Sequence, residues 1–489
     1  MKTIVVLGGG TAGLIAAITT KKSFPNYNIK IIESDSIGII GVGEGSTEHW
    51  ARWTQYCEID LRELIRETDA ALKKGIKFEN WNGDGKSYFH SVGEMWYPYD
   101  KPINTNEFVK SLIIQGIKTE DPLLDTNLIN ANFGIRTVNQ YHFNTFKLNS
   151  YLHKICSERN IEVINDTISD VVLSSTGDVD YIIGEKTNYS ADFFIDSSGF
   201  KRVIASKLGT KFISYKKYLP MNHALAFPTD DVTDLKPHTL TRALSSGWNW
   251  RISTQGRYGN GYVFCDDFID STKAHDEIQS FYTEEVKVAK DIKFEPGRVD
   301  KFWINNCLSI GLSASFVEPL EASSIGNSIL QAFTFCEMLD DWFSDRNVSK
   351  KYNEYYIECF DNIVDFIQLH YITKRNDTDF WRALPSMMER TDFIKEHLDH
   401  FSKHLPSSHY FTGRYTMFNA PNWAQVMAGL DLYDKDFIKN NLLTTHGSSI
   451  INEQNDKFER YLRSLESDPY IEHKVLLDQH NILVKFERK

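Results

Sequence analysis

A glycine-rich turn near the N-terminus carries the residue types that bind a phosphate-linked nucleotide. Gly8, Gly9, Gly10 and Gly13 lie in the run Gly-Gly-Gly-Thr-Ala-Gly, and Glu33 stands 20 residues after the last of them. Glycines let the backbone turn tightly and approach a pyrophosphate, and the N–H groups of a following helix stabilise its charge. A carboxylate accepts a hydrogen bond from a ribose hydroxyl. The spacing therefore predicts a dinucleotide site.

The residues around this turn predict the elements that such a site requires. Residues 3–7 have the pattern of a strand, a helix is expected from the glycine turn to about Lys22, and residues 28–33 form a second strand pattern ending at the acid. Strand, glycine turn, helix, strand and terminal acid together predict a βαβ nucleotide-binding unit.

Later segments favour FAD over NAD as the nucleotide. Strand patterns recur at residues 161–165, 168–184, 193–199 and 308–313, and the second of them is a meander that turns at 176–178. Each pattern by itself is that of an ordinary buried strand. Their order is typical of FAD-binding monooxygenase-like folds, in which separated pieces of chain return to one nucleotide sheet.

A tryptophan pair marks a different part of the chain. Residues 247–253 read Gly-Trp-Asn-Trp-Arg-Ile-Ser, and strand periodicity places Trp248, Trp250 and Ile252 on one face. Two indoles then line a single wall. Such a pair is more often core packing than chemistry, because each ring buries roughly 150–250 Å², so both interpretations stay open here.

Composition excludes several classes of function. The 489 residues hold 54 Lys and Arg against 66 Asp and Glu, a net charge of −12, which argues against nucleic-acid and anionic-membrane partners. The length suits two or three domains. Six scattered cysteines show no Cys-x-x-Cys and no metal-ligand spacing, so we expect reduced thiols, a cytoplasmic protein and no metal site. The glycines within the uncharged run 3–20 argue against a signal peptide, and no stretch reaches a membrane span.

Five blocks together resemble the flavin-dependent halogenases, particularly the tryptophan-halogenase type. They are 8–13 (Gly-Gly-Gly-Thr-Ala-Gly), 41–44 (Gly-Val-Gly-Glu), 72–81 (Leu-Lys-Lys-Gly-Ile-Lys-Phe-Glu-Asn-Trp), 247–252 and 316–321 (Phe-Val-Glu-Pro-Leu-Glu). The resemblance extends to about residue 385. It implies an α/β fold: an FAD-binding Rossmann-like module of monooxygenase type at 1–88, 140–215 and 296–345, an interleaved substrate region at 89–139 and 216–295, and a helical C-terminal part at 346–489 that caps the substrate site.

The resemblance also implies the chemistry. In these halogenases reduced FAD (FADH2), O2 and a halide ion yield hypohalous acid, which travels through a tunnel to an aromatic small molecule held apart from the flavin. Lys73 matches the family lysine that receives the hypohalous acid, and Glu321 matches the glutamate beside it. Without the family, Lys73 would be interpreted as a solvated lysine and Glu321 as an acid at a helix N-terminus. The chain has no second glycine fingerprint for NAD(P)H, so a separate flavin reductase is expected as its partner.

Further site residues follow by position in the family motifs. The expected FAD contacts are Gly8, Gly9, Gly10, Thr11, Ala12, Gly13, Glu33, Ser34, Glu44, Gly45, Ile168, Leu312 and Ile325. The expected halide positions are Ser323 and Ser324, and the expected substrate or tunnel residues are His90, Val92, Trp248, Trp250, Phe316 and Trp423. Residues 37–48 resemble the strap between the flavin and substrate sites, although a plain surface loop fits them equally well.

Departures from the family pattern bear on the substrate. Ser253 replaces a proline, Val92 replaces an aromatic residue two places after His90, and the segment 422–425 (Asn-Trp-Ala-Gln) lacks the family's tyrosine pair. Ser323-Ser324 stands in place of Thr-Gly. These changes favour an electron-rich aromatic substrate other than free tryptophan. An FAD-dependent aromatic hydroxylase and a non-catalytic flavin-binding protein are the alternatives, and regiochemistry, preferred halide and a homo-oligomeric state stay open.

The last part of the chain has helical periodicity. Apolar residues recur at helical spacing in 353–371, and 392–404 and 450–466 look similar. We expect amphipathic helices there, joined by polar loops.

Overall fold

The computed structural model describes residues 1–39, 44–91, 95–96, 103–104, 140–230 and 235–447, together with positions 449, 452–453, 456 and 460. Val92, the glycine motif at 41–43 and most of the helix expected at 450–466 lie outside the described residues.

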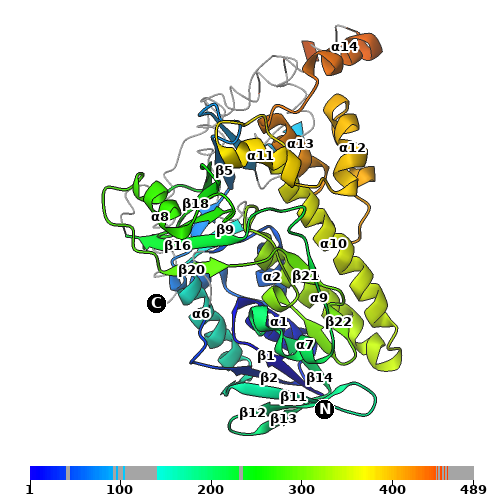
Figure 1. The fold of residues 1–489 in the computed structure, drawn as a ribbon. Coiled ribbons are helices and arrows are strands. Elements are labelled where there is room, and N and C mark those ends of the chain that lie inside the picture. The colour runs from blue at the N-terminus through cyan, green and yellow to red at the C-terminus, as the bar shows by residue number, and fades with distance from the viewer. Residues whose placement is uncertain are drawn as a thin grey trace, which may run out of the picture.

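The predicted βαβ unit is present at one end of the molecule (Figure 1). β1 (Thr3–Leu7) and β2 (Asn28–Glu33) are parallel neighbours joined by helix α1 (Thr11–Ser23). They belong to a six-stranded sheet of order β10-β2-β1-β14-β23-β22, whose other strands are β10 (Glu162–Asn165), β14 (Phe193–Asp196), β23 (Cys307–Ser309) and β22 (Trp303–Ile304). The expected strands at 161–165, 193–199 and 308–313 therefore return to this sheet. β14 and β23 are buried along their whole length, as strands inside a parallel sheet are, whereas the edge strand β10 is largely exposed.

Helices and a meander cover this sheet. Helix α1 packs against α9 (Ser323–Ser344) and α6 (Thr145–Glu158). The predicted meander forms a separate three-stranded sheet of β11 (Ile168–Leu173), β12 (Val179–Gly184) and β13 (Asn188–Ser190). Its turn falls at Gly177, whose φ of 85° favours glycine.

A seven-stranded sheet of order β20-β16-β19-β18-β17-β5-β6 carries the tryptophan strand near its centre. Its members are β5 (Gly75–Glu79), β6 (Ser87–Ser91), β16 (His223–Thr229), β17 (Thr239–Ala243), β18 (Gly247–Ser253), β19 (Tyr258–Phe264) and β20 (Lys290–Lys293). Strands β5 and β6 thus pair with residues of the region that the sequence assigns to the substrate. The domain boundaries themselves stay a prediction.

The tryptophan strand depends on a glycine in its neighbour. Trp250 lies opposite Gly261 of β19, and a Cβ on Gly261 would come within 1.9 Å of the Trp250 ring. Only glycine therefore leaves room for this indole. Trp248 and Trp250 lie on the same face, with ring centroids 6.1 Å apart, and Ser253 ends the strand as a buried residue.

Helices form the C-terminal part, as predicted. Helix α10 (Val348–His370) runs from the nucleotide end to a group of shorter helices at the opposite end (Figure 1), and it begins five residues before the expected position. The shorter helices are α11 (Asp379–Met387), α12 (Asp392–Lys403), α13 (Ala420–Gly429) and α14 (Lys435–His446). Across the described ranges, every helix is too short or too polar to cross a membrane.

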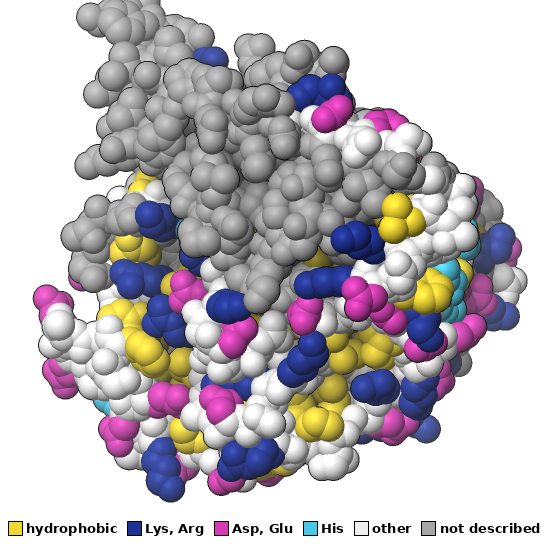
Figure 2. Space-filling model, turned by 90° about the horizontal axis from the view of Figure 1, so that it is seen from above, with side chains coloured by type: hydrophobic (Ala, Val, Ile, Leu, Met, Phe, Trp, Pro, Cys, Tyr) yellow, Lys and Arg dark blue, Asp and Glu magenta, His cyan; other side chains and the backbone are white. Residues whose placement is uncertain are grey.

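The surface carries mixed charge on the face seen in Figure 2. Lys and Arg side chains alternate there with Asp and Glu, and hydrophobic side chains form only small groups between them. The described part of this face therefore has no continuous field of one sign, in agreement with the mixed composition.

Candidate active site

Lys73 is buried in the interior. It ends the short strand β4 (Ala71–Lys73), its exposed fraction is 1%, and its ammonium donates a hydrogen bond to the Ser46 carbonyl at 3.0 Å. Burial lowers the pKa of Lys73 to about 8, although the charges of Glu321 and Glu48 act in the opposite direction. An ammonium has three donors, so Ser46 uses only one of them. The interpretation of Lys73 as a solvated surface lysine is therefore wrong.

A small sheet places Gly45 between Lys73 and the turn that bears Glu321. The sheet has the order β3-β9-β4, in which β3 (Glu44–Gly45) and β4 both pair with β9 (Gln140–Phe143). A Cβ on Gly45 would lie 3.6 Å from Lys73 Nζ and 3.4 Å from the Ala322 side chain. Both distances are ordinary van der Waals separations, so Gly45 lies close to the Lys73 ammonium and to the residue after Glu321.

Glu321 is a buried carboxylate between two histidines. His90 Nδ1, from β6, lies 3.0 Å from each carboxylate oxygen, and His370 Nε2, from the last residue of α10, lies 2.9 Å from Oε1. Burial to 4% exposure alone would raise the pKa of Glu321. The two imidazoles outweigh burial and lower that pKa to about 2, so Glu321 is ionised at neutral pH.

Asn422 fixes the far side of His90. Its Nδ2 lies 3.1 Å from His90 Nε2, and its Oδ1 accepts the backbone N–H of Asn419 in the capping box that starts α13. The neighbouring Gln425 accepts the backbone N–H of Ser91. The polar side chains of this face of α13 therefore hold β6 in place.

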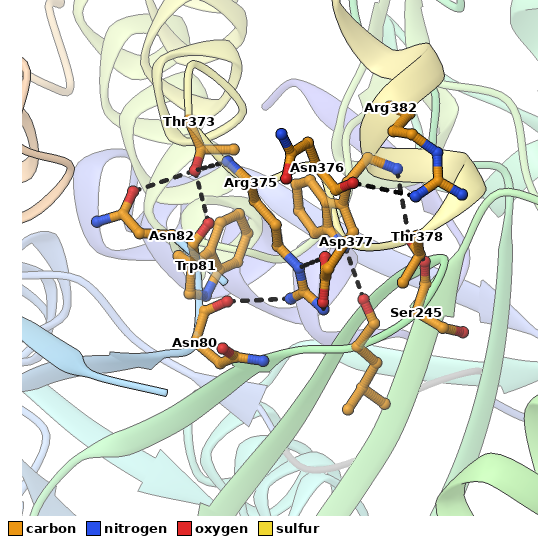
Figure 3. Close-up of polar contacts among 12 residues, drawn as sticks. Asn80, Trp81, Asn82, Ser245, Thr373, Arg375, Asn376, Asp377, Thr378 and Arg382 are labelled. Carbon is orange, nitrogen blue, oxygen red and sulfur yellow. Dashed lines mark hydrogen bonds and ion pairs between the residues drawn. The ribbon is translucent and has the colours of Figure 1, made fainter. Parts of the chain in front are cut away.

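A polar network ties three loops to one another (Figure 3). Arg375 donates to both carboxylate oxygens of Asp377 and to the Asn80 carbonyl, and Thr373 donates to the Trp81 carbonyl. Thr378 donates to the Ser245 carbonyl, just before the tryptophan strand. The segment after His370 is thus bonded to the chain that follows Lys73 and to the loop before β18.

Glu318 is a second buried carboxyl, and it faces the tryptophan wall. Its exposed fraction is 1%, and both the Trp248 indole and the Tyr371 hydroxyl approach it, yet neither completes a hydrogen bond of good geometry. Burial raises the pKa of Glu318 to about 8, and these two donors offset the effect only in part. At neutral pH Glu318 is therefore a neutral acid, three residues before the charged Glu321.

Glu318→Gln should change stability in a pH-dependent manner. The unfolded chain releases the Glu318 proton near its ordinary pKa, whereas the folded protein keeps it to about pH 8. The folded state therefore binds more protons between these values, and its stability falls as pH rises through this window, by roughly 1 kcal/mol per pH unit. Glutamine has no proton to lose. In urea unfolding, the stability of Glu318→Gln relative to the parent should rise from pH 5 to pH 8; a constant difference would contradict the burial argument.

The glycine turn has the shape of a pyrophosphate cradle. Gly8 has a φ of 114°, and a Cβ on Gly13 would meet the Gly8 carbonyl at 2.0 Å, which explains the close packing of helix on strand. No atom lies within 4 Å of the place that a Cβ on Gly10 would occupy, and Gly10 starts α1 without a side-chain cap. Open space beside uncapped helix N–H groups fits a phosphate. Glu33 lies over Gly9 and faces His153 at 3.3 Å.

Some of the other expected FAD contacts come from segments that meet near this turn. A Cβ on Gly311 would lie 2.5 Å from the Ala12 side chain, which brings the loop bearing Leu312 against the start of α1. Ser34 bonds Thr167, the residue before Ile168, at 2.9 Å. The segments that carry Ala12, Leu312, Ser34 and Ile168 therefore lie near the glycine turn, as an FAD site there would require.

The start of α9 fits an anion. Ala322, in the left-handed conformation with φ 54°, precedes the helix and provides no side-chain cap, while Ser323 is buried, Ser324 is exposed and Ile325 is buried. Uncapped N–H groups at a helix N-terminus attract negative charge. The positions expected for halide thus lie two and three residues after Glu321, at the start of this helix.

Two expected tunnel residues have apolar surroundings. Phe316 packs edge-on against Phe200 and Phe294. Trp423 is fully buried, and its ring packs against Phe366, Phe393, Phe401 and Phe411 of the helical part. None of these ring contacts involves Lys73 or Glu321, so the tunnel role of Phe316 and Trp423 stays a prediction.

The sequence interpretation did not single out His370, Asn422 or Glu318. A signal existed for His370, which stands four residues after Phe366 on the buried face of α10, where a histidine is unusual. Asn422 gave none, because its contact depends on how α13 packs on β6.

Comparisons with known proteins show what the chain is similar to. A family model described as tryptophan halogenase matches residues 3–440. The tryptophan 6-halogenase of Streptomyces toxytricini is 27% identical over 452 residues, covering 83% of this chain and 84% of that protein. The tryptophan 7-halogenase of Lentzea aerocolonigenes is 27% identical over 473 residues, covering 88% of this chain and 89% of that protein.

Solved structures share the fold. The crystal structure of the Streptomyces toxytricini enzyme matches with a TM-score of 0.87 at 23% identity, over 98% of this chain and 100% of that one. A flavin-dependent halogenase from Brevundimonas matches with a TM-score of 0.85 at 23% identity, over 98% of this chain and 99% of that one. The predicted mixed α/β fold with a helical C-terminal part is confirmed.

Proposed function

The chain belongs to the tryptophan halogenase family, whose members are flavin-dependent halogenases, and from that premise we propose that it halogenates an electron-rich aromatic compound other than free tryptophan. FADH2 would come from a separate flavin reductase. The observation that carries this proposal is the buried pair of opposite charges, Lys73 and Glu321, beside an uncapped helix N-terminus.

The chain's own residues would hold the reactants apart. Reduced FAD, when bound, supplies with O2 the oxidation of halide to hypohalous acid. The turn at Gly8–Gly13 would hold the pyrophosphate, and the N–H groups at Ser323 and Ser324 would hold the halide. The indoles of Trp248 and Trp250 would form the wall that keeps the aromatic substrate away from the flavin.

Lys73 would hold and polarise the hypohalous acid. Its free N–H donors hydrogen-bond the oxygen of the acid, while Ser46 fixes the ammonium. The halogen–oxygen bond breaks as the ring attacks the halogen, and the ammonium gives a proton to the leaving hydroxide, forming water. Glu321 takes the ring proton and returns it to the Lys73 amine. The sum is aromatic compound plus hypohalous acid to aryl halide plus water.

The polar groups near His90 argue against free tryptophan. Asn422 is committed to His90 and the helix cap, and Gln425 is committed to the backbone of Ser91. The amide oxygens of both side chains are therefore already engaged, which makes them poor acceptors for the ammonium of an amino acid. A neutral aromatic compound needs no such partner, which supports an indole or a phenol.

A product assay tests this function. The full-length protein with FAD, a flavin reductase, NADH and bromide should convert indole or phenol into a monobrominated product, and should convert tryptophan at least about 100-fold more slowly, a difference of about 3 kcal/mol. Omitting bromide should leave no product. A hydroxylated product formed equally well without halide would identify a monooxygenase, and absence of turnover across halides and aromatic compounds would favour a flavin-binding scaffold.

A further inference from the structure

The hydrogen bonds around His90 fix where its proton lies. Asn422 Oδ1 accepts the Asn419 N–H at 2.9 Å, so the amide nitrogen of Asn422 must face His90 Nε2. An amide nitrogen only donates, and His90 Nε2 therefore accepts. The proton of His90 lies on Nδ1, which donates to Glu321.

The hydrogen bonds around His370 require one more proton. His370 Nδ1 lies 2.9 Å from the Phe366 carbonyl, which only accepts, so Nδ1 carries a proton. His370 Nε2 lies 2.9 Å from Glu321 Oε1, out of line for an ideal hydrogen bond but at ion-pair distance. Two lone pairs at this separation would repel each other. A proton on Nε2 removes this repulsion, although the N–H bond is not aligned with Oε1.

We propose that His370 is an imidazolium in the resting protein and forms a buried ion pair with Glu321, which makes His370 a positioning residue that keeps Glu321 ionised. Among the residues that the structure describes, the other titratable groups that face Glu321 are His90 and Tyr88 from β6 and Lys73 from β4. The rings of Phe78 and Trp81 pack against His370 and carry no charge. Neither of these rings can accept its proton, so Glu321 is the acceptor.

The ion pair has a consequence for proton removal, and this consequence rests on the proposed function. A buried carboxyl without a cation tends to stay protonated and cannot accept a further proton. With His370 charged, Glu321 is free to accept. The ring proton moves from carbon to a Glu321 oxygen, the C–H electron pair returns to the ring, and His370 keeps its own proton throughout.

Nitrogen NMR of the resting protein tests the ion pair directly. Full-length, FAD-free protein with ¹⁵N-labelled histidine rings reports which ring nitrogens are protonated in its 15 histidines. Near neutral pH the His370 signal, identified by its loss in His370→Gln, should show both nitrogens protonated, and His90 should show only Nδ1. In Glu321→Gln, His370 should lose the Nε2 proton and keep the one on Nδ1; this change also identifies the signal if His370→Gln fails to fold.

Two outcomes overturn the proposal. An unprotonated Nε2 in the parent protein would place the proton on Glu321, and an imidazolium that persists in Glu321→Gln would show that another group holds the charge. Neither outcome depends on catalysis, so a failure of this proposal can be told apart from a failure of the proposed halogenation.

A pH–rate profile adds a functional measurement. Between pH 8 and pH 6 the halogenation rate of His370→Phe should fall at least about tenfold, whereas the rate of the parent protein should change less than about twofold. His370→Gln, which keeps a neutral donor, should recover part of the loss.

Discussion

Lys73→Met should nearly abolish halogenation while leaving the folded protein more stable. Without the ammonium, hypohalous acid has no donor to hold it and the leaving hydroxide has no proton source, so product formation should fall about 100- to 10,000-fold. The flavin side should stay intact, and hypohalous acid that escapes should be captured by a soluble halogen acceptor. Lys74→Met is the matched control, because the neighbouring lysine is only half-buried and should keep most of its activity.

The stability arm of this experiment is independent of catalysis. The folded state holds the Lys73 proton only to about pH 8, below the ordinary lysine pKa, and so binds fewer protons than the unfolded chain above that pH. Burying the ammonium therefore costs roughly 3 kcal/mol at neutral pH, and stability rises as pH increases from about 8 to 10.5. Urea unfolding should show Lys73→Met gaining stability at pH 7 and losing this advantage toward pH 10. Unchanged bromination by this variant would exclude Lys73 as the carrier of the oxidant.

Gly10→Val should remove FAD binding without disturbing the fold. The backbone of Gly10 is extended, with φ −74° and ψ 172°, which valine adopts readily, and its side chain would enter open space. That space is the proposed pyrophosphate site. FAD affinity should fall at least about 100-fold, a loss near 3 kcal/mol, in a fluorescence titration of the FAD-free protein, whose melting temperature should be unchanged.

Gly13→Ala provides the contrasting variant. Its added methyl group would meet the Gly8 carbonyl, so the packing of α1 on β1 must shift and the melting temperature should drop. Wild-type FAD affinity in Gly10→Val would place the pyrophosphate elsewhere and would remove the glycine turn from the site.

Local spacing predicted the parts of the fold whose geometry is set within a few residues. The glycine turn, the strand at 193–196 and the start of α9 at Ser323 follow from short patterns, and each stands where it was expected. The tryptophan strand was predicted on the same basis, but its burial on both faces comes from a central place in a seven-stranded sheet. Periodicity gives no information about that place.

The charges at the site could not be predicted in the same way. His370 lies 2.9 Å from a glutamate that is far from it in the sequence, because α10 runs back along the molecule and ends beside Glu321. The environments of Lys73 and Glu318 likewise depend on which segments bury them. Local motif spacing therefore identified candidate groups. Their protonation states depend on how elements that are distant in the sequence pack around them.

The contact between Trp250 and Gly261 has a consequence for protein engineering and for evolution. The indole fills the space that a side chain at position 261 would need, so the two positions share one fixed volume. A library that varies either position by itself will yield mostly clashes or cavities. Paired exchange, with a small residue at 250 and a large one at 261, would move aromatic bulk from one strand to the next, and these two positions are expected to covary among relatives.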